Sequence, residues 1–222
     1  MKSSSDLVSD IVGFEIDLSE QWYPVPLEVG NEAARWSALV AGKLAPQAPA
    51  LTELTGQLAA IQDRLRRMDD PYLTVAVWIP VPESGRASCV LGFKAVELSL
   101  TGSPEEFAAA LERDATGQPP GRRVRDVIVW TGDTDAGSLV GANSLIEHRN
   151  PGDAAGVLEE RTIFGVFPPR AAHMVQLIFS THDLAAFANM SQETQELVET
   201  RPCRFGWGCP NDPKDLGGLR RV

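Results

Sequence analysis

The stretch VLEERTIFGVF, residues 157–167, is followed after a short connection by HMVQLIFST, residues 173–181. Both stretches are rich in β-branched and aromatic residues, which favour strands. So short a connection joins antiparallel strands, because a parallel pair needs a crossover of about a dozen residues or more. Residues 184–199 then predict a helix. A strand pair that closes onto a carboxyl-terminal helix is typical of a compact α+β sandwich.

Toward the amino terminus, the clearest pattern is a helical hairpin over residues 31–68. Asn31 is expected to cap its first arm, and two prolines at 46 and 49 end that arm. The opposite face of the second arm is polar and includes Gln62. We expect the hairpin to pack on the sheet rather than to form a coiled coil. The second arm carries an apolar stripe at helical spacing: Leu51, Leu54, Leu58, Ile61 and Leu65.

Alternating apolar residues predict the remaining strands. Residues 21–27 are extended and carry two prolines, which suit the edge of a sheet. Ser103 begins another helix, with proline and carboxylates in its first turn. The acidic stretch at residues 131–137 is expected to form a loop. The other expected strands are 8–18, 73–79, 88–100, 124–130 and 139–149.

This order of elements predicts an α+β fold. Its mostly antiparallel sheet has about seven strands and is flanked by helices, with the helical hairpin inserted after the first strand. We expect one domain over residues 11–202, between a flexible amino terminus at 1–10 and a Cys-, Pro- and Gly-rich tail at 203–222. A chain of 222 residues can bury a sizeable core without covalent staples.

Charge and composition narrow the classes of function. The chain has 30 acidic and 20 basic residues and a net charge of −10, which argues against nucleic acid as a partner because phosphates would be repelled. Residues 1–10 lack the apolar stretch of a secretory signal, and no apolar window of about 18 residues predicts a membrane span. Three cysteines do not make a disulfide framework, so we expect a reducing, cytoplasmic setting.

The most unusual local string is CRFGWGCP at residues 203–210. Cys203 and Cys209 could form a small disulfide or contribute to a metal site. A zinc site usually needs four ligands, and no others lie nearby in the sequence. The favoured interpretation is therefore two free thiols packed around Phe205 and Trp207.

Other strings resemble parts of catalytic or metal sites. Ser180 and Thr181 precede His182, a nucleophile beside a base, but they are interpreted as caps of the helix expected at residue 184. The acidic loop lacks the third acidic ligand and the bidentate glutamate of a calcium loop. No phosphate-binding loop, dinucleotide fingerprint or nucleophile elbow occurs. The sequence therefore predicts no catalytic residue, no metal and no cofactor.

The order of elements at the two ends of the domain matches a known arrangement. It consists of a first strand followed by LSEQW at 18–22, then VQLIFST at 175–181, a terminal helix and a short segment with Phe205. In this order the chain resembles the Mog1/PsbP-like superfamily. The resemblance implies an antiparallel sheet flanked by helices. Members are mostly non-catalytic adaptors: photosystem extrinsic subunits, nuclear transport cofactors, actinobacterial lipoproteins and secretion-effector chaperones. The sequence shows no lipobox, and no functional residue carries over from the superfamily.

The favoured function is a non-enzymatic protein-binding module: an adaptor, a chaperone or an assembly subunit. Large amphipathic rings on extended segments are favoured at protein contacts. The expected contact surface therefore involves Trp22, Tyr23, Phe205 and Trp207.

Two alternatives stay open. The chain could be a structural component of a multi-subunit particle, in which residues 157–167 or 88–100 offer a strand edge to another chain. It could also be a hydrolase whose site is assembled from residues far apart in the sequence. The candidates for such a site are Asp126, His148, Glu160 and His182.

Overall fold

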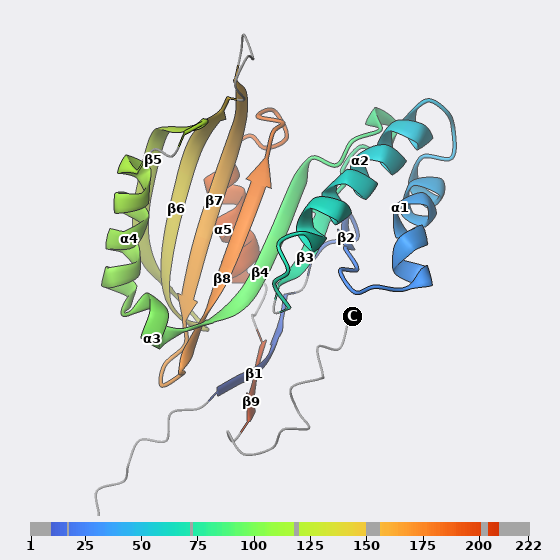
Figure 1. Cartoon of the computed structure of the whole chain (residues 1–222). Helices are drawn as coiled ribbons and strands as arrows, with labels where there is room; N and C mark the ends of the chain where they lie inside the picture. The colour runs from blue at the N-terminus through green and yellow to red at the C-terminus, as the bar shows by residue number, and fades with distance from the viewer. Residues whose placement is uncertain are drawn as a thin grey trace, which may run out of the picture.

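The computed structural model describes residues 10–16, 18–71, 73–117, 120–149, 156–200 and 204–208. At its centre is a seven-stranded antiparallel sheet in the order β2-β3-β4-β8-β7-β6-β5 (Figure 1). The predicted α+β class, with an antiparallel sheet flanked by helices, is confirmed. In sheet order the strands are β2 (Trp22–Pro24), β3 (Thr74–Trp78), β4 (Cys89–Glu97), β8 (His173–Thr181), β7 (Val157–Phe167), β6 (Gly137–His148) and β5 (Arg122–Thr134).

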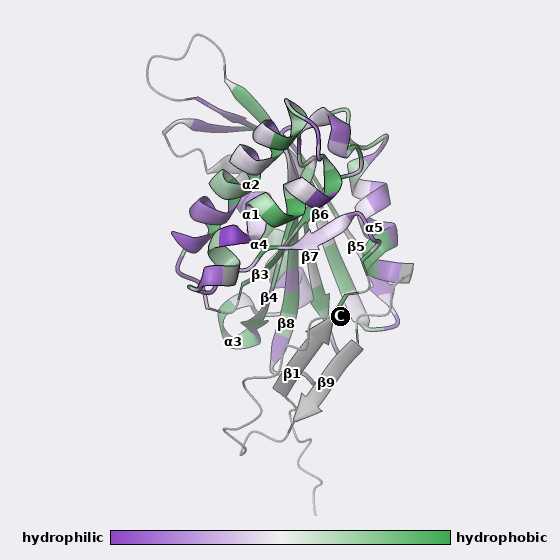
Figure 2. Cartoon of the chain, turned by 90° about the vertical axis from the view of Figure 1, so that its right-hand side faces the viewer, coloured by the Kyte–Doolittle hydropathy of each residue, from purple (hydrophilic) through white to green (hydrophobic). Residues whose placement is uncertain are grey.

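Helices cover both faces of the sheet (Figure 1). The helix α5 lies on one face, here called the α5 face, and the other helices lie on the opposite face, here called the α4 face. Figure 2 shows hydrophobic colour along the strands that the helices cover. The helices are α1 (Asn31–Leu44), α2 (Ala50–Arg66), α3 (Leu98–Thr101), α4 (Pro104–Thr116) and α5 (Met190–Thr200), and a 3₁₀ turn spans Pro82–Ser84.

Strand alternation divides the core between the two faces. On β3, Val77 packs with the α2 cluster, whereas its neighbour Ala76 belongs to the cluster that includes residues of α5. On β6, Val140 packs with Phe107 of α4, whereas Leu139 belongs to the α5 cluster. The sheet is therefore buried on both faces over much of its area.

The two strands quoted at the outset are β7 and β8, and their predicted bounds are confirmed. Both lie inside the sheet, because β7 pairs with β6 and β8, and β8 pairs with β7 and β4. The strand β4 is also internal, since it pairs with β3 and β8. The prediction that residues 157–167 or 88–100 offer a free edge is therefore wrong. The outer strands are β5 and the proline-bearing β2.

The expected acidic loop at 131–137 is mostly strand. The strand β5 continues to Thr134 and β6 begins at Gly137, so the chain turns within two residues. The hydroxyl of Thr134 donates to the carbonyl of Gly137 (3.0 Å) and accepts from the amide of Ala136 (3.2 Å). The acidic side chains of this stretch therefore extend from a tight hairpin.

The last helix begins later than residue 184. Asn189 caps it by accepting from the amide of Gln192 (3.2 Å), and α5 starts at Met190. Ahead of it, residues 184 and 185 form a turn, and Phe187 stacks on Trp78 with ring centroids 4.8 Å apart. The prediction that Ser180 and Thr181 cap the helix is wrong. The Thr181 hydroxyl instead donates to the carbonyl of Ser88 (2.6 Å).

The helical hairpin lies between β2 and β3, and it packs on the sheet as expected through Leu54 and Leu58 of α2. Its cap differs from the prediction. Gly30 is the N-cap of α1, Asn31 is the first helical residue, and no side chain bonds to the free amides there.

Gln62 also differs from the prediction, because it is buried rather than on a polar outer face. Its amide donates to the carbonyls of Pro26 (2.8 Å) and Ala33 (3.0 Å). A buried amide with partners stabilises a unique packing, whereas one without partners would be costly. Gln62 therefore ties α2 to α1 and to the segment before it.

A second, two-stranded sheet joins segments from the two ends of the chain. The strand β1 (Asp10–Glu15) pairs antiparallel with β9 (Arg204–Gly208). The expected first strand at 8–18 is therefore shorter and lies outside the seven-stranded sheet. The rest of the expected tail and nearly all of residues 1–10 lie outside the described residues. Among the described helices, none has the length and apolar character that crossing a bilayer requires.

Candidate binding groove between helix α5 and strand β5

The structure places Trp22, the first of the expected contact residues, in the core. Its ring is only 8% exposed. It stacks on Trp78 with centroids 6.2 Å apart and meets Phe179 edge-on at 6.0 Å. A ring packed in this way has no surface to offer a partner, so its assignment to the contact surface is corrected.

The other expected contact residues do not form a described surface either. Tyr23 is half-buried on the α4 face, against the hairpin cluster, and burial raises its pKa with a smaller contribution from Glu20. Phe205 and Trp207 lie on β9, whose backbone alone is described. Cys203 and Cys209 lie outside the described residues. Elsewhere, Cys89 is buried, which raises the pKa of its thiol to about 12 and leaves it unreactive.

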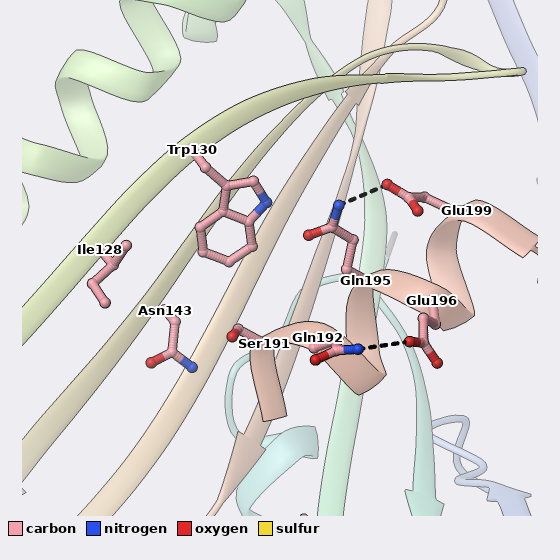
Figure 3. Close-up of a pocket in the computed structure, with 8 residues that line it drawn as sticks. All are labelled: Ile128, Trp130, Asn143, Ser191, Gln192, Gln195, Glu196 and Glu199. Atoms are coloured by element: carbon pink, nitrogen blue, oxygen red, sulfur yellow. Dashed lines mark hydrogen bonds between the residues drawn. The ribbon is translucent and has the colours of Figure 1, made fainter. Parts of the chain in front are cut away.

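A groove of about 430 Å³ lies on the α5 face, between α5 and the outer strand β5 (Figure 3). We call it the α5–β5 groove. Its floor comes from β5 and β6, and its wall comes from one side of α5. The lining residues are Ile128, Trp130, Asn143, Ser191, Gln192, Gln195, Glu196 and Glu199.

Strand register and helix periodicity bring these residues together. Ile128 pairs across the strands with Asn143, and Trp130 pairs with Gly141, so the floor residues share one face. On α5, the lining residues recur at spacings of three and four and therefore share one side of the helix. The opposite side of α5 is buried through Met190, Thr194 and Val198. Figure 2 shows the outer part of α5 in hydrophilic colours.

Trp130 lies flat across its strand neighbour because that neighbour is a glycine. A Cβ atom at Gly141 would lie within 2.7 Å of the indole nitrogen and closer still to ring carbons, so only glycine leaves room for the ring. Phe164 meets the ring edge-on, with centroids 5.9 Å apart. Together these contacts fix the indole in one position.

The indole nitrogen of Trp130 is buried, and among the described residues it has no hydrogen-bond acceptor. Figure 3 shows this nitrogen on the side of the ring toward Gln195. A buried donor without an acceptor costs about 1–3 kcal/mol. An acceptor that a bound molecule brought into the groove would remove that cost.

The helix side of the groove is acidic and rich in amides. Gln195 donates to Glu199 (2.7 Å) and Gln192 donates to Glu196 (3.1 Å), as the dashed lines in Figure 3 mark. Each amide holds a carboxylate four residues further along the helix. Among the described residues, no lysine or arginine lines the groove. This wall therefore presents negative charge to an incoming ligand.

The floor of the groove reaches the edge of the sheet. Ile128 is 61% exposed although it is a large apolar residue on a central stretch of β5. Within the part of the chain that is described, no strand pairs with the outer side of β5. The groove is thus continuous with a row of backbone amides and carbonyls that point outward.

A different polar cluster lies on the α4 face around Glu159, which is 2% exposed. Its carboxylate accepts from the Ser180 hydroxyl (2.7 Å) and from Arg161 Nε (2.8 Å), and His148 Nε2 lies 2.5 Å from its other oxygen. Burial alone would raise the pKa of Glu159. The bonds from Ser180, Arg161 and His148 outweigh burial, so that pKa lies below its ordinary value.

The Glu159 cluster does not have the layout of a nucleophilic triad. In such a triad the imidazole lies between the hydroxyl and the carboxylate, and it takes the proton of the hydroxyl. Here the Glu159 carboxylate lies between Ser180 and His148, which bond to different oxygens. The arrangement therefore orients a carboxylate and does not activate Ser180.

The structure does not bring together the four residues of the hydrolase alternative. His148 and His182 lie on the α4 face with ring centroids 6.3 Å apart. Glu160 points to the α5 face, where it accepts from Asn143 (3.1 Å), and Asp126 is aligned with it across Leu145 on that face. The sheet separates the carboxylates from the imidazoles. The predicted hydrolase site made of these four residues is therefore wrong.

Comparison with protein-family models and with curated proteins gives no match. The resemblance to the Mog1/PsbP-like superfamily stays a prediction. Over the described ranges, no three histidine, cysteine or acidic side chains gather in a way that could hold a metal ion. The α5–β5 groove is therefore the candidate functional site.

Proposed function

We propose that this protein is a protein-binding module and that its contact surface is the α5–β5 groove. It would act as an adaptor, a chaperone or an assembly subunit, in a reducing, cytoplasmic setting. One observation carries the proposal: a rigidly held indole, whose buried N–H has no acceptor among the described residues, lies on an outer strand whose edge no described strand covers. The resemblance to a superfamily of mostly non-catalytic adaptors points the same way.

Three properties of the groove favour a protein segment as its ligand. Ile128 is exposed next to the indole, and aromatic rings with apolar neighbours are enriched at the centres of protein contacts. The free edge of β5 can pair with the backbone of another chain. The carboxylates of Glu196 and Glu199 would repel the phosphates of a nucleic acid.

Affinity capture with a matched pair of variants tests this proposal. The bait is the full chain as wild type, as Ile128→Asn and as Val157→Asn. Val157 is 54% exposed and also lies on a strand, but away from the groove. Bound proteins from the host lysate are quantified by mass spectrometry, and the retained candidates are then titrated as purified proteins by calorimetry.

We expect at least one partner that binds wild type and Val157→Asn but binds Ile128→Asn at least about tenfold more weakly, as for a central interface residue. A partner that binds all three baits equally would place the contact elsewhere. If every captured species were lost with Val157→Asn as well, the effect of Ile128→Asn would not be specific to the groove, and the proposal would fail.

A further inference from the structure

We infer that the α5–β5 groove takes an extended peptide segment with a lysine or arginine side chain, paired as an added strand on the outer edge of β5. This inference rests on the proposed function and names the class of partner. It is carried by the shape of the edge, by the alternation of side chains and by the charge of the groove wall.

Only part of the β5 edge suits an added strand. The register with β6 shifts between Val124 and Asp126, which marks a bulge, and Arg122, Arg123 and Arg125 lie around it. Bulges and charged residues on an edge oppose continued pairing. From Val127 onward the register is regular to the end of the strand. A segment of about six residues, or about 20 Å, can pair along this regular part.

The bulge also argues against a second copy of this chain as the occupant. Two β5 strands paired about Ile128 would each set a bulged, arginine-rich half against the partner's regular half. Such pairing would break the ladder on both sides of the centre. A short extended segment avoids that conflict because it needs only the regular part.

Strand alternation decides which side chains of the added segment enter the groove. Every second side chain would point to the α5 face, where Ile128 and Trp130 lie two positions apart on the neighbouring strand. The two side chains that enter the groove are then about 7 Å apart. One packs on Ile128, and the other lies over Trp130 between β5 and α5 (Figure 3).

Charge selects the second of these side chains. Glu196 and Glu199 form the wall beside Trp130, and within the described part of the chain no basic residue lines the groove or lies in the last turn of α5. A lysine or arginine there meets the carboxylates and the face of the indole together.

The test is a selection of peptides from a phage-displayed library of random dodecapeptides against the full chain, with counter-selection against Ile128→Asn. Affinities of synthetic versions are measured by fluorescence polarisation for wild type, for Glu196→Gln/Glu199→Gln and for a control, Glu83→Gln/Glu112→Gln. The control removes the same charge from exposed positions outside the groove. Each peptide is also made with one backbone amide methylated at a time.

We expect the selected peptides to share a lysine or arginine at a fixed position in a β-prone segment. The groove variant should bind them about fivefold to tenfold more weakly than the control variant, with the largest difference at low salt. Methylation should abolish binding at alternate positions only, because alternate amides of an added strand face β5.

Three results would overturn the inference. The first is selection of neutral or acidic peptides, or equal binding by the groove and control variants. The second is a methylation scan without alternation, which would indicate another backbone conformation. A selection that gives no peptide sensitive to Ile128→Asn would overturn the inference in the same way. The third is reversible dimerisation in sedimentation that Ile128→Asn removes, which would make a second copy the occupant. The capture experiment decides the proposed function separately, so either idea can fail alone.

Discussion

Two polar clusters of this molecule differ in how completely their groups are bonded. Around Glu159, a buried carboxylate has partners from Ser180, Arg161 and His148, and its pKa is lowered as a result. In the α5–β5 groove, the carboxylates lie on an open helix face, and the indole N–H of Trp130 is buried without a described acceptor.

This difference separates a structural role from a binding role. A polar network whose members are satisfied stabilises the fold and has little left to offer a ligand. A buried donor without an acceptor is a cost that native proteins keep rarely, and a function is a common reason for it. Neither cluster is recognisable from residue types alone, since both combine glutamates with aromatic or hydroxyl neighbours. What distinguishes them is the set of bonds that the fold leaves unmade.

The largest effect is expected for Trp22→Ala, which removes a ring from the interior. Loss of a buried tryptophan side chain should lower the free energy of unfolding by about 3–5 kcal/mol. Trp130→Ala should cost less than half of that, because this ring is only partly covered. Urea unfolding followed by far-ultraviolet circular dichroism measures both. Equal losses would contradict the distinction between core and groove.

The next effect is expected for Glu159→Ala. Removal of one partner from a buried charge cluster typically costs 3–5 kcal/mol, and we expect about 3 kcal/mol here because Arg161 and His148 keep some contact with water. The same urea titration measures it. A loss under about 1 kcal/mol would mean that the cluster does not hold the sheet together. The hydrogen bond from Ser180 to Glu159 would then need a role other than stabilising the fold.

Acid unfolding should report the same carboxylate. Because the folded-state pKa of Glu159 lies below its ordinary value of about 4.3, its stabilisation is full above that pH and is lost as the pH falls through the folded pKa. Glu159→Gln should therefore flatten the fall in stability below about pH 4.3. Parallel curves for wild type and Glu159→Gln would argue against the bonded network.

The smallest effect on stability is expected in the groove itself. Glu196→Gln/Glu199→Gln should change the free energy of unfolding by less than about 0.5 kcal/mol, since both carboxylates are exposed and accept hydrogen bonds from glutamines of the same helix. Thermal unfolding measures it. A marked loss would mean that the acidic wall stabilises α5, which would weaken its assignment to binding.

Much of the fold was predictable because its strands alternate strongly. The bounds of β7 and β8 follow from eleven and nine residues rich in β-branched and aromatic side chains, and the stripe on α2 fixes the hairpin. Residue type was less informative where the same polar residues suit both a loop and an edge strand. Residues 131–134 read as a loop because they are polar, yet an edge strand tolerates polar residues on its open side.

The candidate site was not predictable, because it depends on pairing between distant strands. Ile128, Asn143 and Ser191 meet only after β5, β6 and α5 have taken their places in the sheet. The sequence contains one usable hint, the glycine at 141, but its role becomes clear only when Trp130 lies across it. The prediction that Trp22 lies on the contact surface was wrong for another reason. A proline-rich segment at the edge of a sheet still buries one of its two faces.

The most direct test of the binding claim is the indole N–H resonance of Trp130 in a two-dimensional ¹⁵N spectrum of the full chain, assigned by its loss in Trp130→Phe. On addition of a selected basic peptide, we expect this resonance and the amides of residues 127–132 to shift in a saturable way, while the indole of the buried Trp36 stays in place. A Trp130 resonance that does not move while amides of β2 or of the α4 face do would contradict the account.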